Sequence, residues 1–118
     1  MQMSLIPRKA SAVVLVQPCP KAGTPDGPIE VYLTQRPDSM AFAGGNFVFP
    51  GGKLDRSDYA PDNLTHVHGM EPEQAARLLG DGESPERAMG FFLAAIRELF
   101  EEAGILLCTT PGGDLPDL

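Results

Sequence analysis

Residues 97–105 read Arg-Glu-Leu-Phe-Glu-Glu-Ala-Gly-Ile, and they place three carboxylates within about one and a half turns of a predicted helix. Glu98 and Glu102 lie one turn apart on the same face, with Glu101 beside them. Because like charges this close repel one another, we expect a divalent cation here, since Mg²⁺ and Mn²⁺ prefer carboxylate, carbonyl and water oxygens. The alternative is a solvent-exposed acidic helix end in which Arg97 pairs with Glu101.

A long amphipathic helix is predicted to carry these residues. Ser84 is a favourable N-cap, Pro85 suits the first helical position and Gly104 ends the helix. Gly90 lies in its interior at a cost of about 1 kcal/mol relative to Ala, which indicates a kink or a close packing contact. We expect the carboxylates to face away from the sheet, which would be covered by an apolar stripe of Ala88, Phe92, Ala95, Leu99 and Ala103.

Short apolar runs before and after this helix are typical of strands. Residues 12–16 and 29–34 predict two strands joined by a wide hairpin loop rich in Pro and Gly. Residues 46–49 predict a third strand, which leads into a glycine turn at Gly51-Gly52, and residues 105–108 begin a fourth. Strands combined with a long helix predict an α/β fold.

The glycine turn and the acidic helix together resemble the Nudix box. That pattern is a Gly, five residues, a Glu, seven residues, Arg-Glu-apolar, one residue, Glu-Glu, one residue and Gly-apolar. Phe49-Pro50-Gly51-Gly52-Lys53 supplies its first half and residues 97–105 supply its second half. The pattern has 14 positions from its Gly to its Arg, whereas Gly52 and Arg97 are 45 positions apart, so 31 residues are inserted. We assign the insertion to roughly residues 56–83.

Counted back from Arg97, the first Glu of the box falls on Met89, so that Glu is missing there. In the family this Glu mainly holds the Arg in position, while the later carboxylates bind the metal. Glu83 is no substitute on a continuous helix, because six extra residues would rotate it by roughly 240° and shift it by about 9 Å. We therefore expect the metal cluster to be retained and Arg97 to lack its usual partner.

A narrower resemblance is to the Nudix coenzyme A diphosphatases. Leu33-Thr34-Gln35-Arg36, Met40, Gly44-Gly45, Phe47 to Gly52 and Asp55 are similar to the segment that precedes the box in that group. The long insertion followed by Phe-Glu-Glu-Ala-Gly resembles its branch that acts on acyl-coenzyme A esters in animals. The resemblance implies substrate contacts at Arg36, Gly51, Gly52 and Lys53, although Arg36 could equally be a surface arginine.

The resemblance also implies a metal-dependent mechanism. Mg²⁺ or Mn²⁺ would polarise the diphosphate and lower the pKa of a water that attacks phosphorus. Glu98 could instead orient or deprotonate this water, and Arg97 would position the carboxylates or stabilise the transition state. The metal ligands would be the carbonyl of Gly52 and the carboxylates of Glu98, Glu101 and Glu102.

The fold implied by the family is an α/β/α sandwich with a mixed sheet. It needs further strands and a second helix after the box helix, whereas residues 109–118 are rich in Pro, Gly and Asp. We therefore predict that residues 1–118 are the N-terminal part of a single Nudix domain. A second copy of the chain could instead complete the sheet, which would give a homodimer.

The insertion contains one predicted element, a short amphipathic helix over residues 72–79 that would form a lid or a structural patch. His66 and His68 stand two apart, but no further metal ligands accompany them, which argues against a separate metal site.

Composition narrows the class of partner. The net charge of −7 argues against nucleic-acid binding and would repel a diphosphate, so a cation is needed to bridge the two. No apolar run is long enough for a membrane span. Cys19 and Cys108 do not suggest a disulfide framework, which favours reduced thiols in the cytoplasm or an organelle matrix.

Two other functions are consistent with these residues. A Nudix-fold module that binds a nucleotide without cleaving it is favoured by Met89 at the position of the box Glu and opposed by the intact Arg-Glu and Glu-Glu pairs. A purely structural acidic helix would bind no ligand at all. The main prediction is a divalent-metal-dependent hydrolase of a nucleoside diphosphate derivative, with coenzyme A or its acyl esters as the substrate.

Overall fold

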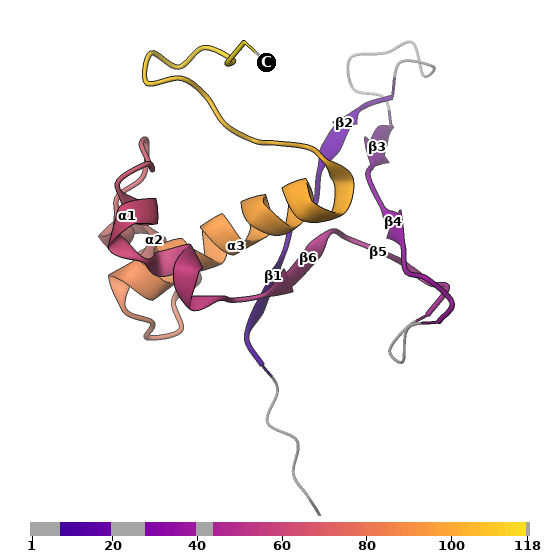
Figure 1. The fold of residues 1–118 in the computed structure, drawn as a ribbon, viewed down its shortest axis with the longest axis horizontal. Helices are drawn as coiled ribbons and strands as arrows, with labels where there is room; N and C mark the ends of the chain where they lie inside the picture. The colour runs from indigo at the N-terminus through magenta and orange to yellow at the C-terminus, as the bar shows by residue number, and fades with distance from the viewer. Residues whose placement is uncertain (1–7, 20–27, 40–43, 118) are drawn as a thin grey trace, which may run out of the picture.

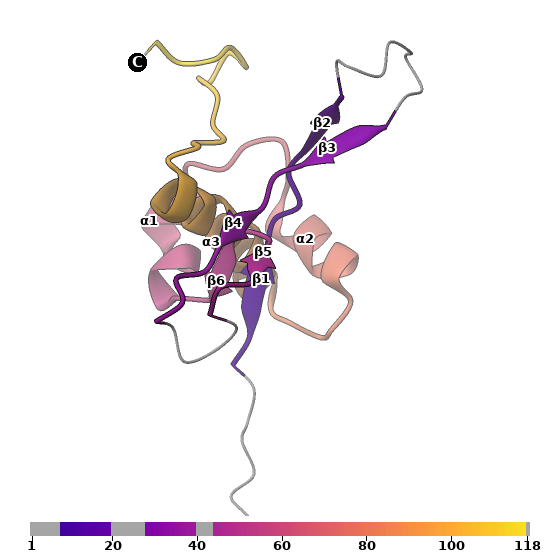
Figure 2. The same cartoon turned by 90° about the vertical axis from the view of Figure 1, so that its right-hand side faces the viewer.

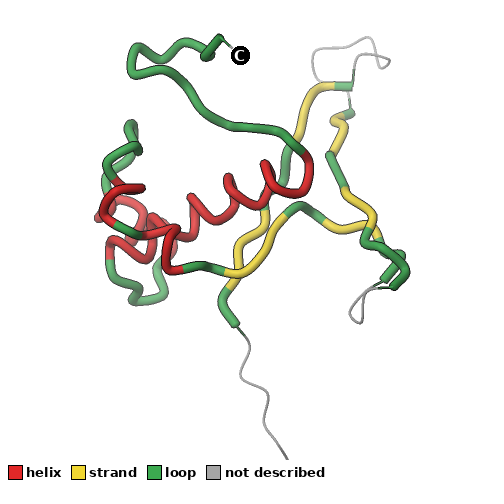
Figure 3. Tube along the Cα trace, in the orientation of Figure 1, coloured by secondary structure: helices red, strands yellow, loops and turns green. Residues whose placement is uncertain are grey.

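A single long helix, α3 (Pro85–Ala103), runs through the middle of the molecule (Figure 1). The computed structural model describes residues 8–19, 28–39 and 44–117. The short helices lie around the N-terminal half of α3, and most of the strands lie toward its C-terminal end (Figure 3). Helices and strands together confirm the predicted α/β class. Met40 and most of the predicted hairpin loop are outside the described residues.

The strands form three separate antiparallel pairs. β1 (Ala10–Ala12) pairs with β6 (Gly51–Lys53), β2 (Val16–Pro18) pairs with β3 (Ile29–Val31), and β4 (Thr34–Gln35) pairs with β5 (Phe47–Val48). The β2–β3 hairpin extends away from the helices (Figure 2). Within the described ranges no parallel pair is present, so the mixed sheet of the predicted sandwich is not formed by these strands.

The predicted strand over residues 12–16 is divided in two. Val13 N donates to Pro50 O at 2.8 Å, while Tyr32 N donates to Leu15 O at 2.9 Å. The chain therefore changes partner within this run, from the segment that contains β6 to the segment that contains β3. The run predicted over residues 29–34 is likewise divided into β3 and β4, and the strand predicted over residues 46–49 is present as β5.

Gly51 and Gly52 were predicted to form a turn, but they lie in β6. At Gly51 an added Cβ would collide with the backbone of Ser11 and Ala12. Gly51 is therefore needed because two backbones approach closely, which is a common reason for Gly in a strand.

Helix α3 follows its sequence prediction closely. Ser84 Oγ accepts a hydrogen bond from Arg87 N at 3.3 Å, and Gly104 adopts a left-handed φ of 70° that ends the helix. Ala88, Ala94 and Leu99 are fully buried. Gly90 was expected to mark either a kink or a close packing contact. It makes a close contact, because an added Cβ would lie 2.9 Å from Tyr59 Cβ.

The insertion folds into three short helices that pack on α3. These are η2 (Arg56–Tyr59), α1 (Pro61–Leu64) and α2 (Pro72–Leu79), and the bounds of α2 agree with the prediction. Ala75 from α2 is buried against Ala88 and Met89 of α3. Partly buried side chains surround this cluster: Leu64, Val67, Met70, Ala76, Phe92 and Leu93. The packing favours the structural patch over the lid.

The chain continues past α3 without regular structure. Residues 105–117 contain no helix or strand, so the fourth strand predicted over residues 105–108 is not formed (Figure 1). A turn closes this segment, in which Thr110 N donates to Asp114 O at 2.7 Å. Leu106, Leu107 and Leu115 are exposed. Among the helices that the structure describes, none has the length and apolar character that a bilayer crossing needs.

Candidate active site

Arg97 lies at the centre of the candidate site and is held by Asp58. Arg97 Nε donates to Asp58 Oδ1 at 2.8 Å and Arg97 Nη2 donates to Asp58 Oδ2 at 3.0 Å. This bidentate geometry is the strongest arrangement of an arginine and a carboxylate. Only 3% of the Asp58 side chain is exposed, compared with 28% for Arg97. The hydrogen bonds that Arg97 donates to Asp58 raise the pKa of Arg97 above its ordinary value, so the guanidinium stays charged.

Asp58 is itself fixed by the turn that carries it. Asp55 N donates to Asp58 Oδ2 at 2.8 Å, and Ser57 N donates to Asp55 Oδ1 at 2.9 Å. These two bonds form a capping box at the start of η2. The hydrogen bond from the Ser57 amide also lowers the pKa of Asp55. The carboxylate of Asp58 is therefore oriented before it meets Arg97.

Sequence reasoning missed Asp58, although the pattern contained the information. Counted forward from Gly52, five residues precede Asp58, which is the position of the first Glu in the Nudix box. Counting back from Arg97 gave Met89, which is 2% exposed and belongs to the hydrophobic cluster. The expected loss of the usual Glu partner therefore does not leave Arg97 unpaired, because Asp58 holds it instead. An Asp occupies the place of the Glu, and the segment assigned to the insertion includes this site residue.

The two halves of the box meet where β6 passes α3. The Glu98 carboxylate lies directly against Gly52, because a Cβ added to Gly52 would overlap the Glu98 carboxyl carbon and both of its oxygens. Gly51 N donates to Glu102 Oε2 at 3.3 Å. Glu98 and Glu102 therefore face the strand, contrary to the expectation that they point away from it.

Glu101 is placed differently from the other two carboxylates. Arg97 Nη1 donates to Glu98 Oε1 at 2.8 Å and to Glu101 Oε2 at 3.1 Å. The Glu101 side chain is 56% exposed. The pairing of Arg97 with Glu101, which was the alternative interpretation of this helix end, is therefore present. Arg97 Nη2 also donates to Lys53 O at 3.1 Å, which ties the helix to β6.

The arrangement suits Mg²⁺ or Mn²⁺ by its chemistry. Within the described residues no three Asp, Glu, His or Cys side chains converge to form a complete cage. Mg²⁺ does not require one, since it usually binds through one or two carboxylates together with waters and substrate phosphates. Glu98 and Glu102 provide two such carboxylates next to the backbone of Gly51 and Gly52. The donor set therefore fits a hard divalent cation.

The remaining predicted residues lie around this centre. Lys53 is exposed at the end of β6, next to Gly52. Arg36 is half-buried beside the β4–β5 pair, where its backbone N donates to Asn46 O at 2.9 Å. Their contact with substrate stays a prediction. Each histidine has a protein partner: His66 Nδ1 lies 2.8 Å from Asp62 O, and His68 Nε2 lies 2.9 Å from Thr109 Oγ1.

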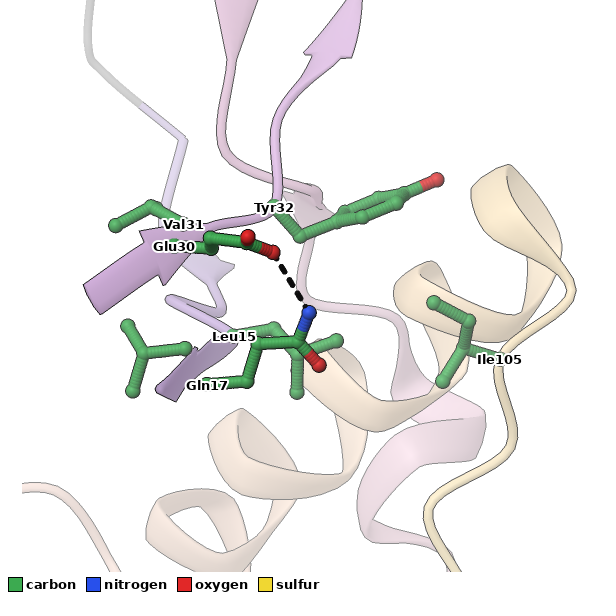
Figure 4. A pocket seen from close by; sticks show the side chains of 7 residues that line it. Leu15, Gln17, Glu30, Val31, Tyr32 and Ile105 are labelled. Atoms are coloured by element: carbon green, nitrogen blue, oxygen red, sulfur yellow. Dashed lines mark hydrogen bonds between the residues drawn. The ribbon is translucent and has the colours of Figure 1, made fainter. Parts of the chain in front are cut away.

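A cavity of about 390 Å³ lies between the β2–β3 hairpin and the end of α3 (Figure 4). Ile105, one of its lining residues, follows Glu102 by three positions, so the cavity is close to the acidic end of the helix. At its edge Gln17 Nε2 donates to Glu30 Oε2 at 2.8 Å, and this bond lowers the pKa of Glu30. The lining residues are Leu15, Val16, Gln17, Glu30, Val31, Tyr32 and Ile105.

Comparison with known proteins gives similar proteins, among them two acyl-coenzyme A diphosphatases. No family model and no solved structure matches the chain. The acyl-coenzyme A diphosphatase NUDT19 of Homo sapiens is 31% identical over 141 residues, which cover 92% of this chain and 37% of that protein. The protein of the same name from Gallus gallus is 32% identical over 127 residues, covering 90% of this chain and 33% of that protein. The chain spans about a third of the length of these relatives. The chain is thus similar to these acyl-coenzyme A diphosphatases over about nine-tenths of its own length.

Proposed function

We propose that this chain carries the cleavage centre of a divalent-metal-dependent diphosphatase whose substrate is coenzyme A or an acyl-coenzyme A. The observation that carries the proposal is the junction of Gly51 and Gly52 with Glu98 and Glu102, fixed by Arg97 and Asp58. The names of the two relatives favour acyl-coenzyme A among the nucleoside diphosphate derivatives.

In the proposed reaction a water attacks one phosphorus of the diphosphate and the bridging P–O bond breaks. The bound cation would polarise the phosphoryl group and lower the pKa of that water. Glu98 and Glu102 would hold the cation from one side of α3, with the Gly52 backbone facing them. Arg97 would keep Glu98 in place through its Nη1 donor, while Asp58 prevents the guanidinium from turning. The products are two phosphomonoesters, adenosine 3′,5′-bisphosphate and acyl-phosphopantetheine.

Charge explains why such a site needs cations. The chain has a net charge of −7, and a diphosphate would be repelled without compensation. Lys53, exposed next to Gly52, is proposed to contact the substrate phosphates, with Arg36 as a second candidate. Charge at these positions would act mainly on substrate binding.

The cavity beside the end of α3 is proposed to receive an uncharged part of the substrate. Glu30 at its edge disfavours phosphate, whereas Tyr32, Leu15 and Ile105 offer apolar surface. Pockets that bind small molecules typically combine such surface with a few polar groups. Replacing Tyr32 with Ala should raise KM for acyl-coenzyme A by about fivefold with kcat unchanged. This is the result expected when a contact contributes equally to binding of the substrate and of the transition state.

A nucleotide-binding module without activity is the alternative. Its main support was the apparent loss of the first box Glu, and this support is weaker because Asp58 stands at that position and binds Arg97.

The two free cysteines are compatible with the proposed cytoplasmic location.

A substrate panel on the full-length protein tests the proposal. Coenzyme A, an acyl-coenzyme A, ADP-ribose and a diadenosine polyphosphate would each be incubated with Mg²⁺ and with Mn²⁺. We expect metal-dependent product from the coenzyme A compounds and its loss in Glu102→Gln. Glu86→Gln is the matched control, because Glu86 is exposed on the first turn of the same helix. Binding of a nucleotide without product would favour the module, and activity retained in Glu102→Gln would refute the proposed metal ligand.

A further inference from the structure

The two ends of the insertion are joined by one arginine of α3. Tyr59 directly follows Asp58, and Glu83 directly precedes the N-cap of α3. Arg87 Nε donates to Glu83 Oε2 at 2.9 Å, and Arg87 Nη1 lies 3.5 Å from Tyr59 Oη. The guanidinium carbon of Arg87 is 5.4 Å from the centre of the Tyr59 ring, within the range of a cation–π contact. Arg87 thus contacts one residue near each end of the inserted segment.

Glu83 is shielded from water and is satisfied by two cations. Its side chain is only 8% exposed, and it pairs with Lys9 as well as with Arg87. A carboxylate this shielded is costly to leave unpaired. Lys9 precedes β1, which pairs with the strand that contains Gly52. The ion pairs of Glu83 therefore link α3 to the N-terminal strand as well as to the insertion.

Tyr59 is also pressed against the backbone of α3. A Cβ added to Gly90 would lie 2.9 Å from Tyr59 Cβ and 3.1 Å from its Cδ1. Real Cβ atoms essentially never approach within 3.0 Å, so Tyr59 occupies the space that a side chain at position 90 would need. Because Tyr59 is adjacent to Asp58 in η2, its position on α3 sets how far Asp58 is from Arg97.

We propose that Glu83, Arg87 and Tyr59 form a brace that positions Asp58 and, through Asp58, orients Arg97 in the active site. The proposal rests on the diphosphatase function proposed above. The three are positioning residues, and Arg97 and the metal-binding carboxylates remain the groups at the reacting centre. The inserted helices then serve as a fixed support for the second half of the Nudix box. Such support residues typically change activity by about 10- to 100-fold when they are removed.

The test compares Arg87→Gln and Glu83→Gln with Arg77→Gln in the full-length protein. Arg77 is exposed on α2 and serves as the matched control. Two quantities are measured: the hydrogen-exchange rate of the Arg97 Nε–H by ¹⁵N NMR, assigned with Arg97→Lys, and kcat with KM for acyl-coenzyme A. We expect both brace variants to exchange the Arg97 Nε–H about tenfold faster and to lose about tenfold in kcat, with KM changed less than about twofold. Tyr59→Phe should behave as wild type, because the ring is kept.

Unchanged Arg97 exchange and unchanged kcat in folded Arg87→Gln and Glu83→Gln would overturn the brace. If either variant fails to fold by circular dichroism, Tyr59→Leu provides the same comparison. This substitution removes the ring that Arg87 contacts and keeps the ion pairs of Glu83. The wild-type protein could show no hydrolysis while the variants still exchange the Arg97 Nε–H faster. This result would support the brace and refute the diphosphatase function. Loss of kcat with unchanged Arg97 exchange would also overturn it, because the brace is proposed to act through Arg97.

Discussion

A buried aspartate and a partly exposed arginine determine the geometry of the candidate site. Asp58 is one carbon shorter than the Glu expected at its position, yet it engages both Nε and Nη2 of Arg97. The shorter side chain suffices because η2 follows β6 after only two residues and brings its backbone close to α3. Lys53 O, which precedes this turn, accepts from the same Nη2 group. One guanidinium thus joins the strand, the turn and the helix.

Replacing Asp58 with Asn should destabilise the protein by about 2 kcal/mol. Breaking a fully buried ion pair costs roughly 3–5 kcal/mol, and the figure is lower here because 28% of the Arg97 side chain is exposed. Urea unfolding measures the change. Asp62→Asn, at an exposed position in α1, is the control and should be neutral. A loss below about 0.5 kcal/mol in Asp58→Asn, typical of surface substitutions, would contradict the role of the pair.

Acid should loosen the turn that holds Asp58. The Ser57 amide lowers the pKa of Asp55 by hydrogen bonding to its charged form. A group with a lowered folded-state pKa contributes stability that is present above the ordinary Asp value of about 3.9 and is lost as the pH falls through the lowered value. A ¹³C NMR titration of the Asp55 carboxyl should therefore give a midpoint below about 3.9.

The variant Asp55→Asn separates the hydrogen bond from the titration. Its side-chain oxygen can still accept from Ser57 N, but it carries no ionisable proton. The Ser57 amide resonance should therefore lose most of its acid-induced shift in this variant. An Asp55 midpoint at or above the ordinary value in the wild type would show that the capping bond does not favour the charged form.

At the scale of elements, helices were easier to predict from the sequence than strands. Ser84, Pro85 and Gly104 mark the limits of α3 by local chemistry, and the same is true of α2. The strands depend on partners that are distant in sequence, so the run over residues 12–16 could not reveal that it changes partner. Gly51-Gly52 illustrates the same limit. Glycine is compatible both with a turn and with a strand that packs closely on its neighbours, and residues distant in sequence determine which of the two forms.

Gly90→Ala tests the contact between η2 and α3 by the sign of its effect. Helix propensity alone predicts a gain of about 1 kcal/mol, whereas a methyl group 2.9 Å from Tyr59 Cβ should cause a net loss of about 1–2 kcal/mol through overpacking. The free energy of unfolding decides between them. In a Tyr59→Gly background, which also removes the Tyr59 Cβ atom, the substitution should become stabilising. A gain in the wild-type background would mean that Tyr59 does not pack on Gly90.

Gly52→Ala tests the junction between β6 and α3. The added methyl group would occupy the position of the Glu98 carboxylate, so the carboxylate must move away. We expect activity to fall by about 100-fold, at the upper end for residues that support a metal site. Gly112→Ala, where the nearest heavy atom is 3.7 Å from the added Cβ, is the control. Activity within about twofold of wild type would place Glu98 outside the site.

At the scale of the molecule, a long insertion separates the two halves of the site in sequence but not in space. Residues 97–105 and the Gly51-Gly52 pair could be recognised from the sequence because their residue types are specific to the chemistry. The partner of Arg97 could not be recognised by counting from the helix, because the insertion changes the spacing on that side only. The helices of the insertion bury Ala75 against Ala88 and Met89, so the insertion packs on the same helix that carries Arg97. The prediction that further strands and a second helix complete the fold remains to be tested.

The most direct test of the split site is paramagnetic broadening by Mn²⁺ in ¹H–¹⁵N NMR spectra. At substoichiometric Mn²⁺, we expect the amide signals of Gly51 and Gly52 to broaden together with those of Glu98 and Glu102, since one ion near both segments relaxes both sets. Glu102→Gln should weaken both effects in parallel. Broadening confined to α3, or spread evenly over exposed acidic residues such as Glu71 and Glu73, would contradict a shared metal site.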